Sequence, residues 1–356
     1  MAWLSGWKNR VKATISYANV PSAGVTWFPV LVHISSSCGI NNDNISFIFS
    51  NVGSSYKKIA VTKDDGTTEL YVEVESWDYT GDPFTSSAWI WVSKSGWSIS
   101  GTVDTDIYLY YDITHADNSN VDLVNTTVGG YVWDSNFKAV WHLSESSGTL
   151  YDSTSNNNDL TAYNSPTYGY TGKIGKCMDF DGATQKLKRA SAVVIGYPLT
   201  MEAWANLDAW TYLMSIQRST TSYQAHATLG QSYASYLCSA SGDVYANTSN
   251  TFSLGTWVYI VARGTSSTLR EVYLNADVAN KGTSTYNKQP SGMNLTTVGG
   301  LDGLWGDNSN LCDGRLDEVR ISNSARSEGW IQSTYYTCKD SFLFWTPAPT
   351  SWVIIM

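Results

Sequence analysis

Hydrophobic and polar residues alternate along much of this 356-residue chain. Such a period of two is typical of β-strands that bury one face and expose the other. In segment 69–77, the apolar residues fall on one face of the expected strand, and Glu73 and Glu75 fall on the other. We therefore expect an antiparallel strand whose glutamates lie on a solvated face.

The same pattern recurs between segments rich in Gly, Asn, Asp and Ser, which are typical of turns. It predicts strands at 12–17, 27–34, 45–49, 88–92, 107–111, 138–143, 178–180, 199–205, 257–262, 271–274, 296–298 and 315–321. A helical period is clear only at 327–335, where Ser327 can cap the helix and Glu328 lies in its first turn. The sequence predicts an all-β protein of two antiparallel β-sandwich domains with one short closing helix.

The length of the chain favours two domains, because a typical domain has roughly 150 residues. We expect an N-terminal β-sandwich domain at 1–113, a polar linker at 114–135 and a second β-sandwich domain at 136–340. The apolar segment 341–356 follows, and Pro347 and Pro349 interrupt it. Two arrangements remain open for this segment: packing as a strand or seam on its own chain, or strand addition to a neighbouring subunit.

Composition narrows the classes of partner. Charged residues make up 15% of the chain and aromatic residues 13%, which argues against disorder. The net charge of −9 offers no basic field for phosphates, so we expect no nucleic-acid partner. We find neither a signal-peptide pattern nor an apolar run of roughly 18 residues, and expect synthesis in the cytoplasm without membrane insertion. The five cysteines are odd in number and widely spaced, so we expect buried thiols.

Four blocks in the second half of the chain form an ordered series. They are AVWHLSE at 139–145, YDST at 151–154, GKIGKCMDFDG at 172–182 and GRLDEVRIS at 314–322. With LTMEAW at 199–204 and ARSEGWI at 325–331, they make region 136–340 resemble the laminin-G-like, concanavalin-A-like jelly rolls of the lectin/glucanase superfamily. The first region is similar to a small β-rich domain of unknown function that often precedes such jelly rolls, on GWKNR at 6–10 and DIYLYY at 106–111.

The resemblance raises the question of glycosidase activity, since relatives include glucanases. Glycoside hydrolysis needs two carboxylates about 5–9 Å apart that face one cleft. The closest acidic group, Glu73, Glu75 and Asp78, lies outside the jelly-roll region and lacks the glucanase spacing. The four histidines form no zinc-binding motif, and no Gly-x-Ser-x-Gly elbow or phosphate loop occurs. We therefore expect a protein without enzymatic activity.

A cation is one candidate ligand, because the resemblance implies that a calcium ion can lie at the rim of such a sandwich. Ca²⁺ prefers six to eight oxygen ligands, commonly from a loop, and segment 152–159 is rich in Asp and Asn. The candidate ligands are Asp152, Asn157 and Asp317, the last on the same strand face as Val319 and Ile321. The alternative is that Asp152 begins an Asx-turn and Asp317 caps a turn through backbone N–H groups.

Sugar is the other candidate ligand. Carbohydrate sites combine aromatic platforms with Asn and Asp side chains, and binding residues concentrate in loops. The loop around Trp305, Asp307 and Asn308 has this composition, and Trp210 and Tyr212 lie in a second candidate loop.

These inferences favour a nonenzymatic virion surface protein of the decoration or tail-fibre type, made in the cytoplasm, with a lectin-like domain. Its expected partners are glycans or the host cell surface, other virion proteins and further copies of itself, so we expect a homo-oligomer. Two alternatives remain open. One is a secreted or cell-surface adhesin or glycan-binding accessory module, and the other is a purely structural virion protein without a ligand.

Overall fold

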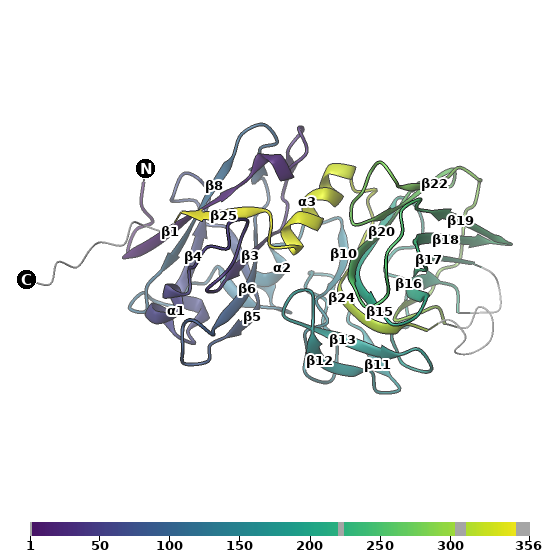
Figure 1. Ribbon diagram of the computed structural model, residues 1–356, viewed down its shortest axis with the longest axis horizontal. Coiled ribbons are helices and arrows are strands. Elements are labelled where there is room, and N and C mark those ends of the chain that lie inside the picture. Colours follow the sequence, from purple (N-terminus) through teal and green to yellow (C-terminus); the bar gives the residue numbers. More distant parts are fainter. Residues whose placement is uncertain (1, 220–223, 303–310, 347–356) are drawn as a thin grey trace, which may run out of the picture. The chain divides into compact units, whose positions relative to one another are not determined.

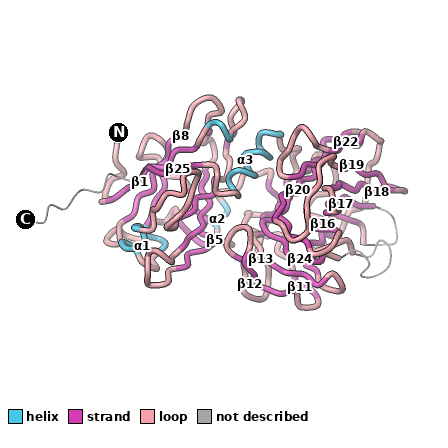
Figure 2. Tube along the Cα trace, in the orientation of Figure 1, coloured by secondary structure: helices cyan, strands magenta, loops and turns pink. Residues whose placement is uncertain are grey.

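The computed structural model describes residues 2–219, 224–302 and 311–346. The chain divides into two compact units: unit 1 comprises Met1–Asp134 and Gln332–Met356, and unit 2 comprises Ser135–Ile331. Strands dominate both units, and helices are few and short (Figures 1 and 2). The prediction of an all-β protein is therefore confirmed.

Unit 1 contains two four-stranded sheets, in the orders β25-β1-β8-β4 and β3-β6-β5-β9, and a small β2-β7 pair. Only the β5-β9 pair is parallel among the described strands of this unit. Its strands are β1 (Asn9–Ile15), β2 (Val25–Thr26), β3 (Val30–Ile34), β4 (Ile59–Thr62), β5 (Tyr71–Asp78), β6 (Ser87–Ser93), β7 (Ser98–Ile99), β8 (Thr105–Tyr111), β9 (Val121–Leu123) and β25 (Leu343–Thr346).

The predicted strand at 45–49 is wrong, because this segment begins the helix α1 (Phe47–Val52). The Asn44 side chain accepts a hydrogen bond from the Ser46 backbone N–H at 3.0 Å, which turns the chain just before the helix. The apolar residues Ile48 and Val52 then recur after four positions and are both buried. A short run of Ile and Phe fits either a strand or one helical turn, and the preceding turn favoured the helix.

The predicted linker at 114–135 is also wrong, because this segment is part of unit 1. It contains β9, which pairs in parallel with β5, and the helical turn α2 (Thr127–Gly130). Val121, Val132 and Trp133 are buried. These apolar positions are few and lie among polar residues, so they do not form a periodic pattern that would predict a strand or helix.

The strand at 69–77 is confirmed as β5, but its glutamates are not solvated. Glu73 is 0% exposed and Glu75 is 8% exposed. The indole N–H of Trp133 donates to Glu73 Oε2 at 2.7 Å, and that of Trp91 donates to Glu75 Oε2 at 2.8 Å. Aromatic donors distant in sequence thus bury a face that alternation alone assigns to solvent.

The C-terminal segment forms an edge strand of unit 1. Strand β25 lies beside β1 (Figure 1) and pairs with it antiparallel. Lys12 is opposite Thr346 and Ile15 is opposite Leu343. Phe342, Leu343 and Trp345 are buried. Of the two arrangements that the sequence leaves open, residues 343–346 adopt the first, a strand on their own chain.

Unit 2 contains two large antiparallel sheets. The first has the order β12-β13-β24-β15-β20-β21-β22, with β10 also paired to β24, and the second has the order β11-β14-β23-β16-β17-β18-β19. The strands are β10 (Phe137–Trp141), β11 (Thr161–Tyr163), β12 (Thr167–Thr171), β13 (Lys176–Asp181), β14 (Lys186–Arg189), β15 (Leu199–Leu207), β16 (Thr211–Gln217), β17 (Gln224–Gly230), β18 (Ala234–Ala240), β19 (Asp243–Asn247), β20 (Trp257–Ser266), β21 (Leu269–Leu274), β22 (Gly282–Ser284), β23 (Leu295–Val298) and β24 (Asp313–Ser322).

The core of unit 2 lies between these sheets, with Met201 and Ile260 from the first and Ile216 and Tyr236 from the second. The predicted helix is confirmed as α3 (Glu328–Cys338). The chain returns to unit 1 within α3, at Gln332, whereas the sequence pattern predicts that the second domain extends to residue 340.

A bulge in β24 changes one predicted orientation. Strand β15 pairs Glu202 with Arg320 and Trp204 with Asp317, so one extra residue lies on β24 between these pairs. Glu318 has a positive φ of 51° at this point. Because Leu316 and Val319 both belong to the core, the predicted shared face of Asp317 and Val319 is wrong.

Candidate functional site

A cavity of about 370 Å³ opens at one end of the unit 2 sandwich. Four chain segments meet there: the turns that follow β13, β15 and β17, and the start of β24. The lining residues are Gly182, Ala209, Trp210, Thr211, Tyr212, Leu229, Gln231, Leu311 and Asp313. An exposed aromatic ring, an amide and a carboxylate thus converge on one hollow, which is the usual make-up of a small-molecule site.

Hydrogen bonds between distant segments fix the walls of this cavity. The Gly182 N–H donates to the Cys312 carbonyl at 2.8 Å, and the Asp208 N–H donates to the Asp313 carbonyl at 3.0 Å. The Thr211 hydroxyl donates to the Leu311 carbonyl. Gly182 has a φ of 67°, and a Cβ there would lie 2.8 Å from the Asp313 Cβ, so glycine suits this close approach.

The two aromatic rings of the cavity differ in exposure. Trp210 is 47% exposed and is held edge-on by Phe252, with ring centroids 5.6 Å apart at 84°. Tyr212 is half-buried and shares a hydrogen bond with Tyr245, and burial raises the pKa of its hydroxyl. Trp210 therefore offers a ring to a ligand, while Tyr212 forms part of the wall.

The electrostatics of the cavity are acidic. Burial and the nearby carboxylates of Asp208 and Asp181 raise the pKa of Asp313. Asp179, two residues before Asp181 on β13, forms an ion pair with Arg315, with Oδ1 3.5 Å from Nε. The cavity therefore presents the Asp313 carboxylate to a ligand as a hydrogen-bond acceptor.

The structure brings together two of the predicted sugar-binding residues, Trp210 and Tyr212. The other three, Trp305, Asp307 and Asn308, lie outside the described residues. Sequence reasoning missed Gln231 and Asp313, which line the same cavity. They come from separate turns without a shared motif, so no sequence signal joins them to Trp210.

The side chain of Asp152, a predicted cation ligand, accepts hydrogen bonds that hold its own loop together. It is 1% exposed, and its Oδ1 accepts hydrogen bonds from the backbone N–H groups of Val140 at 3.0 Å and Thr154 at 2.9 Å. Its Oδ2 accepts from the Thr154 hydroxyl at 2.9 Å and the Asn158 N–H at 2.8 Å. Burial raises the pKa of Asp152 to about 6, although these donors act in the opposite direction. The contacts fit the Asx-turn alternative of the sequence analysis.

The other two predicted cation ligands have separate surroundings. Asp317 is 0% exposed, and its Oδ2 accepts from the Ile174 N–H at 2.9 Å, which fits the turn-capping alternative. Asn157 is exposed, and its amide group points toward the Ser155 carbonyl at 3.5 Å. These contacts tie Asp317 and Asn157 to different segments, and calcium binding by Asp152, Asn157 and Asp317 stays a prediction.

We expect Asp152→Ala to lower the free energy of unfolding by about 3 kcal/mol, because three backbone N–H groups lose a buried acceptor. Asp181→Ala is the matched control. Its Oδ1 accepts from the N–H groups of Ala183, Thr184 and Gln185, but Asp181 is exposed, so water replaces the carboxylate. Urea unfolding measures both losses, and equal losses would contradict the buried role of Asp152.

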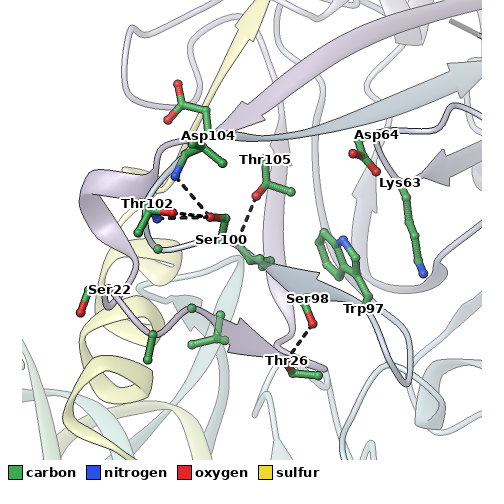
Figure 3. Close-up of a pocket in the computed structure, with 16 residues that line it drawn as sticks. Ser22, Thr26, Lys63, Asp64, Trp97, Ser98, Ser100, Thr102, Asp104 and Thr105 are labelled. Atoms are coloured by element: carbon green, nitrogen blue, oxygen red, sulfur yellow. Dashed lines mark hydrogen bonds between the residues drawn. The ribbon is translucent and has the colours of Figure 1, made fainter.

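Another cavity, of about 620 Å³, lies in unit 1 and borders β2 and β7. Its lining residues include the hydroxyl side chains of Ser22, Thr26, Ser98, Ser100, Thr102 and Thr105, together with Trp97, Lys63 and Asp64 (Figure 3). Several of these hydroxyls are engaged locally: Thr26 and Ser98 lie 2.9 Å apart, and the Ser100 N–H donates to Thr105 at 3.1 Å (Figure 3). Trp97 is 3% exposed, so this cavity offers no open aromatic ring from Trp97.

Comparison with known protein families addresses unit 2. Residues 181–332 match the Laminin_G_3 family, described as the concanavalin A-like lectin/glucanases superfamily. Unit 2 contains a concanavalin A-like jelly-roll domain. The resemblance of the second region to laminin-G-like jelly rolls is thereby confirmed, whereas the resemblance of the first region to a small β-rich domain stays a prediction. No curated protein matches the chain.

Several solved structures are similar to the chain. Domain 4 of AbnA, an extracellular arabinanase from Geobacillus stearothermophilus in complex with arabinotriose, has 18% identity and a TM-score of 0.47, over 55% of this chain and 97% of that one. The binding domain of Paraclostridial Mosquitocidal Protein 1 has 12% identity and a TM-score of 0.44, over 57% of this chain and 52% of that one. Trypanosoma rangeli sialidase in complex with sialic acid has 10% identity and a TM-score of 0.44, over 68% of this chain and 42% of that one.

Two further features concern the cysteines and the helices of the described residues. All five cysteines are buried thiols, as predicted. None of the described helices has the length and apolar character that a membrane crossing requires.

Proposed function

We propose that the jelly-roll domain binds a glycan in the cavity around Trp210, without cleaving it. The observation that carries this proposal is the convergence of an exposed indole with Gln231 and Asp313 in a lectin-type domain. A pyranose or furanose ring has one apolar face and a rim of hydroxyls. The indole takes the apolar face, while the amide and carboxylate accept and donate hydrogen bonds at the rim.

The rigid walls favour this function. Since the backbone bonds at Gly182 and Asp208 hold the cavity in place, little conformational entropy is lost when a ligand binds. The Trp210 ring is also held by Phe252 in the free protein. A site of this kind binds one or two sugar units rather than a long polymer, because its volume is about 370 Å³.

The test is a glycan array followed by titration calorimetry of each positive glycan. We expect Trp210→Ala to weaken binding at least about 10-fold, or about 1.4 kcal/mol, because an aromatic anchor at the centre of a site carries much of the binding energy. After prolonged incubation of the glycan with the protein, we expect no cleavage products, and the glycan is recovered intact.

The matched control is Tyr286→Ala, which removes an aromatic ring that is 73% exposed in the same unit but outside the cavity. It is expected to bind as the unaltered protein does. Equal binding by Trp210→Ala and the unaltered protein would place any glycan elsewhere, and release of sugar would refute binding without cleavage.

We propose the virion surface as the setting, in a decoration or tail-fibre protein that presents the jelly roll to host glycans. Five buried cysteine thiols in two β-rich units support assembly in a reducing compartment over secretion, since secreted domains commonly carry disulfides. The test is the protein content of purified particles from cells that make the protein. Its recovery only from the culture medium, free of particles, would favour the secreted adhesin.

A further inference from the structure

A serine, a histidine and an aspartate of unit 1 form a hydrogen-bonded chain that glycan binding does not use. Ser87 Oγ lies 3.1 Å from His33 Nε2, and Asp340 Oδ2 lies 2.8 Å from His33 Nδ1. Each imidazole nitrogen thus has one partner, in the order Ser-His-Asp. A nucleophile within reach of a base that a third group orients is the geometry of nucleophilic catalysis, and it is recognised by roles rather than by sequence order.

The fold assembles this group from three distant parts of the chain. His33 on β3 is opposite Trp89 on β6, and Ser87 lies two positions before Trp89, on the same face of the sheet. Asp340 follows α3, where its N–H donates to the Thr337 carbonyl at 3.1 Å and its φ is 54°. The three residues are far apart in sequence, and Ser87 is not within a Gly-x-Ser-x-Gly motif, so the sequence does not indicate this group.

The imidazole is held in place and remains accessible. The ring of Trp89 stacks on His33, with centroids 3.7 Å apart and planes at 4°. The side chains of His33 and Asp340 are 13% and 22% exposed, and Ser87 is half-buried. The hydroxyl therefore lies near the surface, where a small substrate can reach it.

We propose that Ser87, His33 and Asp340 form an esterase site for small carboxylic esters. Ser87 Oγ attacks the carbonyl carbon and its proton passes to His33 Nε2. The bond between that carbon and the alcohol oxygen then breaks, and Nε2 returns the proton to the departing alcohol. Water attacks the acyl-serine in the same way, giving its proton to Nε2, and the carboxylic acid leaves as Ser87 regains its proton.

The roles within the group differ. Ser87 and His33 are the catalytic residues, because they exchange the proton and form the covalent bond. Asp340 is a positioning residue: it accepts the hydrogen bond from Nδ1, which keeps Nε2 free to act as the base, and it stabilises the imidazolium that forms. Esters are the expected class because an alcohol leaves more readily than an amine.

The test uses the intact protein with a fluorophosphonate probe and with p-nitrophenyl acetate. We expect mass spectrometry to locate the phosphonyl group on Ser87, and Ser87→Ala to lose both labelling and ester turnover. His33→Gln, which keeps a polar side chain but no base, is expected to slow labelling at least about 100-fold. Ser36→Ala and His115→Ala are the controls, and both should react as the unaltered protein does.

Asp340→Asn tests the positioning role. Asparagine tolerates the positive φ at this position, so the backbone is expected to stay intact. We expect kcat for p-nitrophenyl acetate to fall at least about 10-fold while KM is unchanged, since the substrate does not touch residue 340. A change in KM alone would refute this role.

Absence of label on Ser87 or undiminished labelling in His33→Gln would overturn the esterase proposal. The outcome is independent of glycan binding, because Trp210→Ala is expected to leave labelling unchanged and Ser87→Ala to leave glycan binding unchanged.

Discussion

A chain that ends at Ser341 is expected to lose the folded state of unit 1. This truncation removes β25 and exposes the edge of β1, which pairs with it from Lys12 to Ile15. It also removes Phe342, Leu343 and Trp345, which are 1%, 2% and 3% exposed. Burial of such a side chain stabilises a fold by about 1.5–3 kcal/mol, so the three contribute about 6 kcal/mol together. That is a large part of the roughly 5–15 kcal/mol that a domain has.

Hydrogen exchange resolves this loss by unit. In the truncated chain, amides of β1 and β8 are expected to lose protection, while those of β15 and β20 in unit 2 keep it. A chain that ends at Thr346 retains β25 and is the matched control, with protection expected as in the full chain. Unchanged protection of β1 together with a smaller particle in light scattering would instead favour strand addition to a neighbouring subunit.

Many strands were predictable because one face of each packs into a hydrophobic core and so carries apolar residues at every second position. Segments 199–205 and 257–262 correspond to β15 and β20 for this reason. Alternation fails where something outside the segment decides the environment. Glu73 and Glu75 alternate correctly, yet indole N–H groups from Trp133 and Trp91 reach them and bury them.

The sites were predictable only in part, because sites depend on which turns meet. The composition around Trp210 and Tyr212 indicated a binding loop, but Gln231 and Asp313 join them only through the sheet order. The orientation of Asp317 depends on the bulge at Glu318, which adds one residue to a strand without interrupting its pattern. Such an extra residue shifts every later side chain to the other face.

A buried network of charged groups crosses β15 and β24 in unit 2. Arg320, 2% exposed, donates through Nη2 to Glu318 Oε2, and its Nη1 lies 3.9 Å from Glu202 Oε1. His142 Nδ1 lies 2.6 Å from Glu318 Oε1, and the Tyr259 hydroxyl donates to Glu202. The neighbouring His142 and Arg320 hold the pKa of Glu318 below its usual value, whereas burial raises the pKa of Glu202. The Arg320 guanidinium therefore lies between the two buried carboxylates of Glu318 and Glu202 and offers its positive charge to both.

Arg320→Met is expected to lower the free energy of unfolding by about 3–5 kcal/mol near neutral pH, because it leaves both glutamates buried without this cation. Arg315→Met is the control on the same strand: its side chain is 37% exposed, and its pair with Asp179 is expected to contribute only about 0–1 kcal/mol. Urea unfolding of each variant provides the measurement.

The pH dependence separates loss of charge pairing from loss of packing. Because the folded-state pKa of Glu318 is lowered, its stabilisation is present above the usual glutamic acid pKa of about 4.3 and is lost as the pH falls through the folded-state value. The deficit of Arg320→Met should therefore shrink in acid, where Glu318 and Glu202 are protonated in the variant. Adding Glu318→Gln to Arg320→Met removes one of the buried charges and should recover part of the deficit at neutral pH. A deficit that is the same at every pH and in the double variant would mean that Arg320 stabilises the sheet through its packing alone.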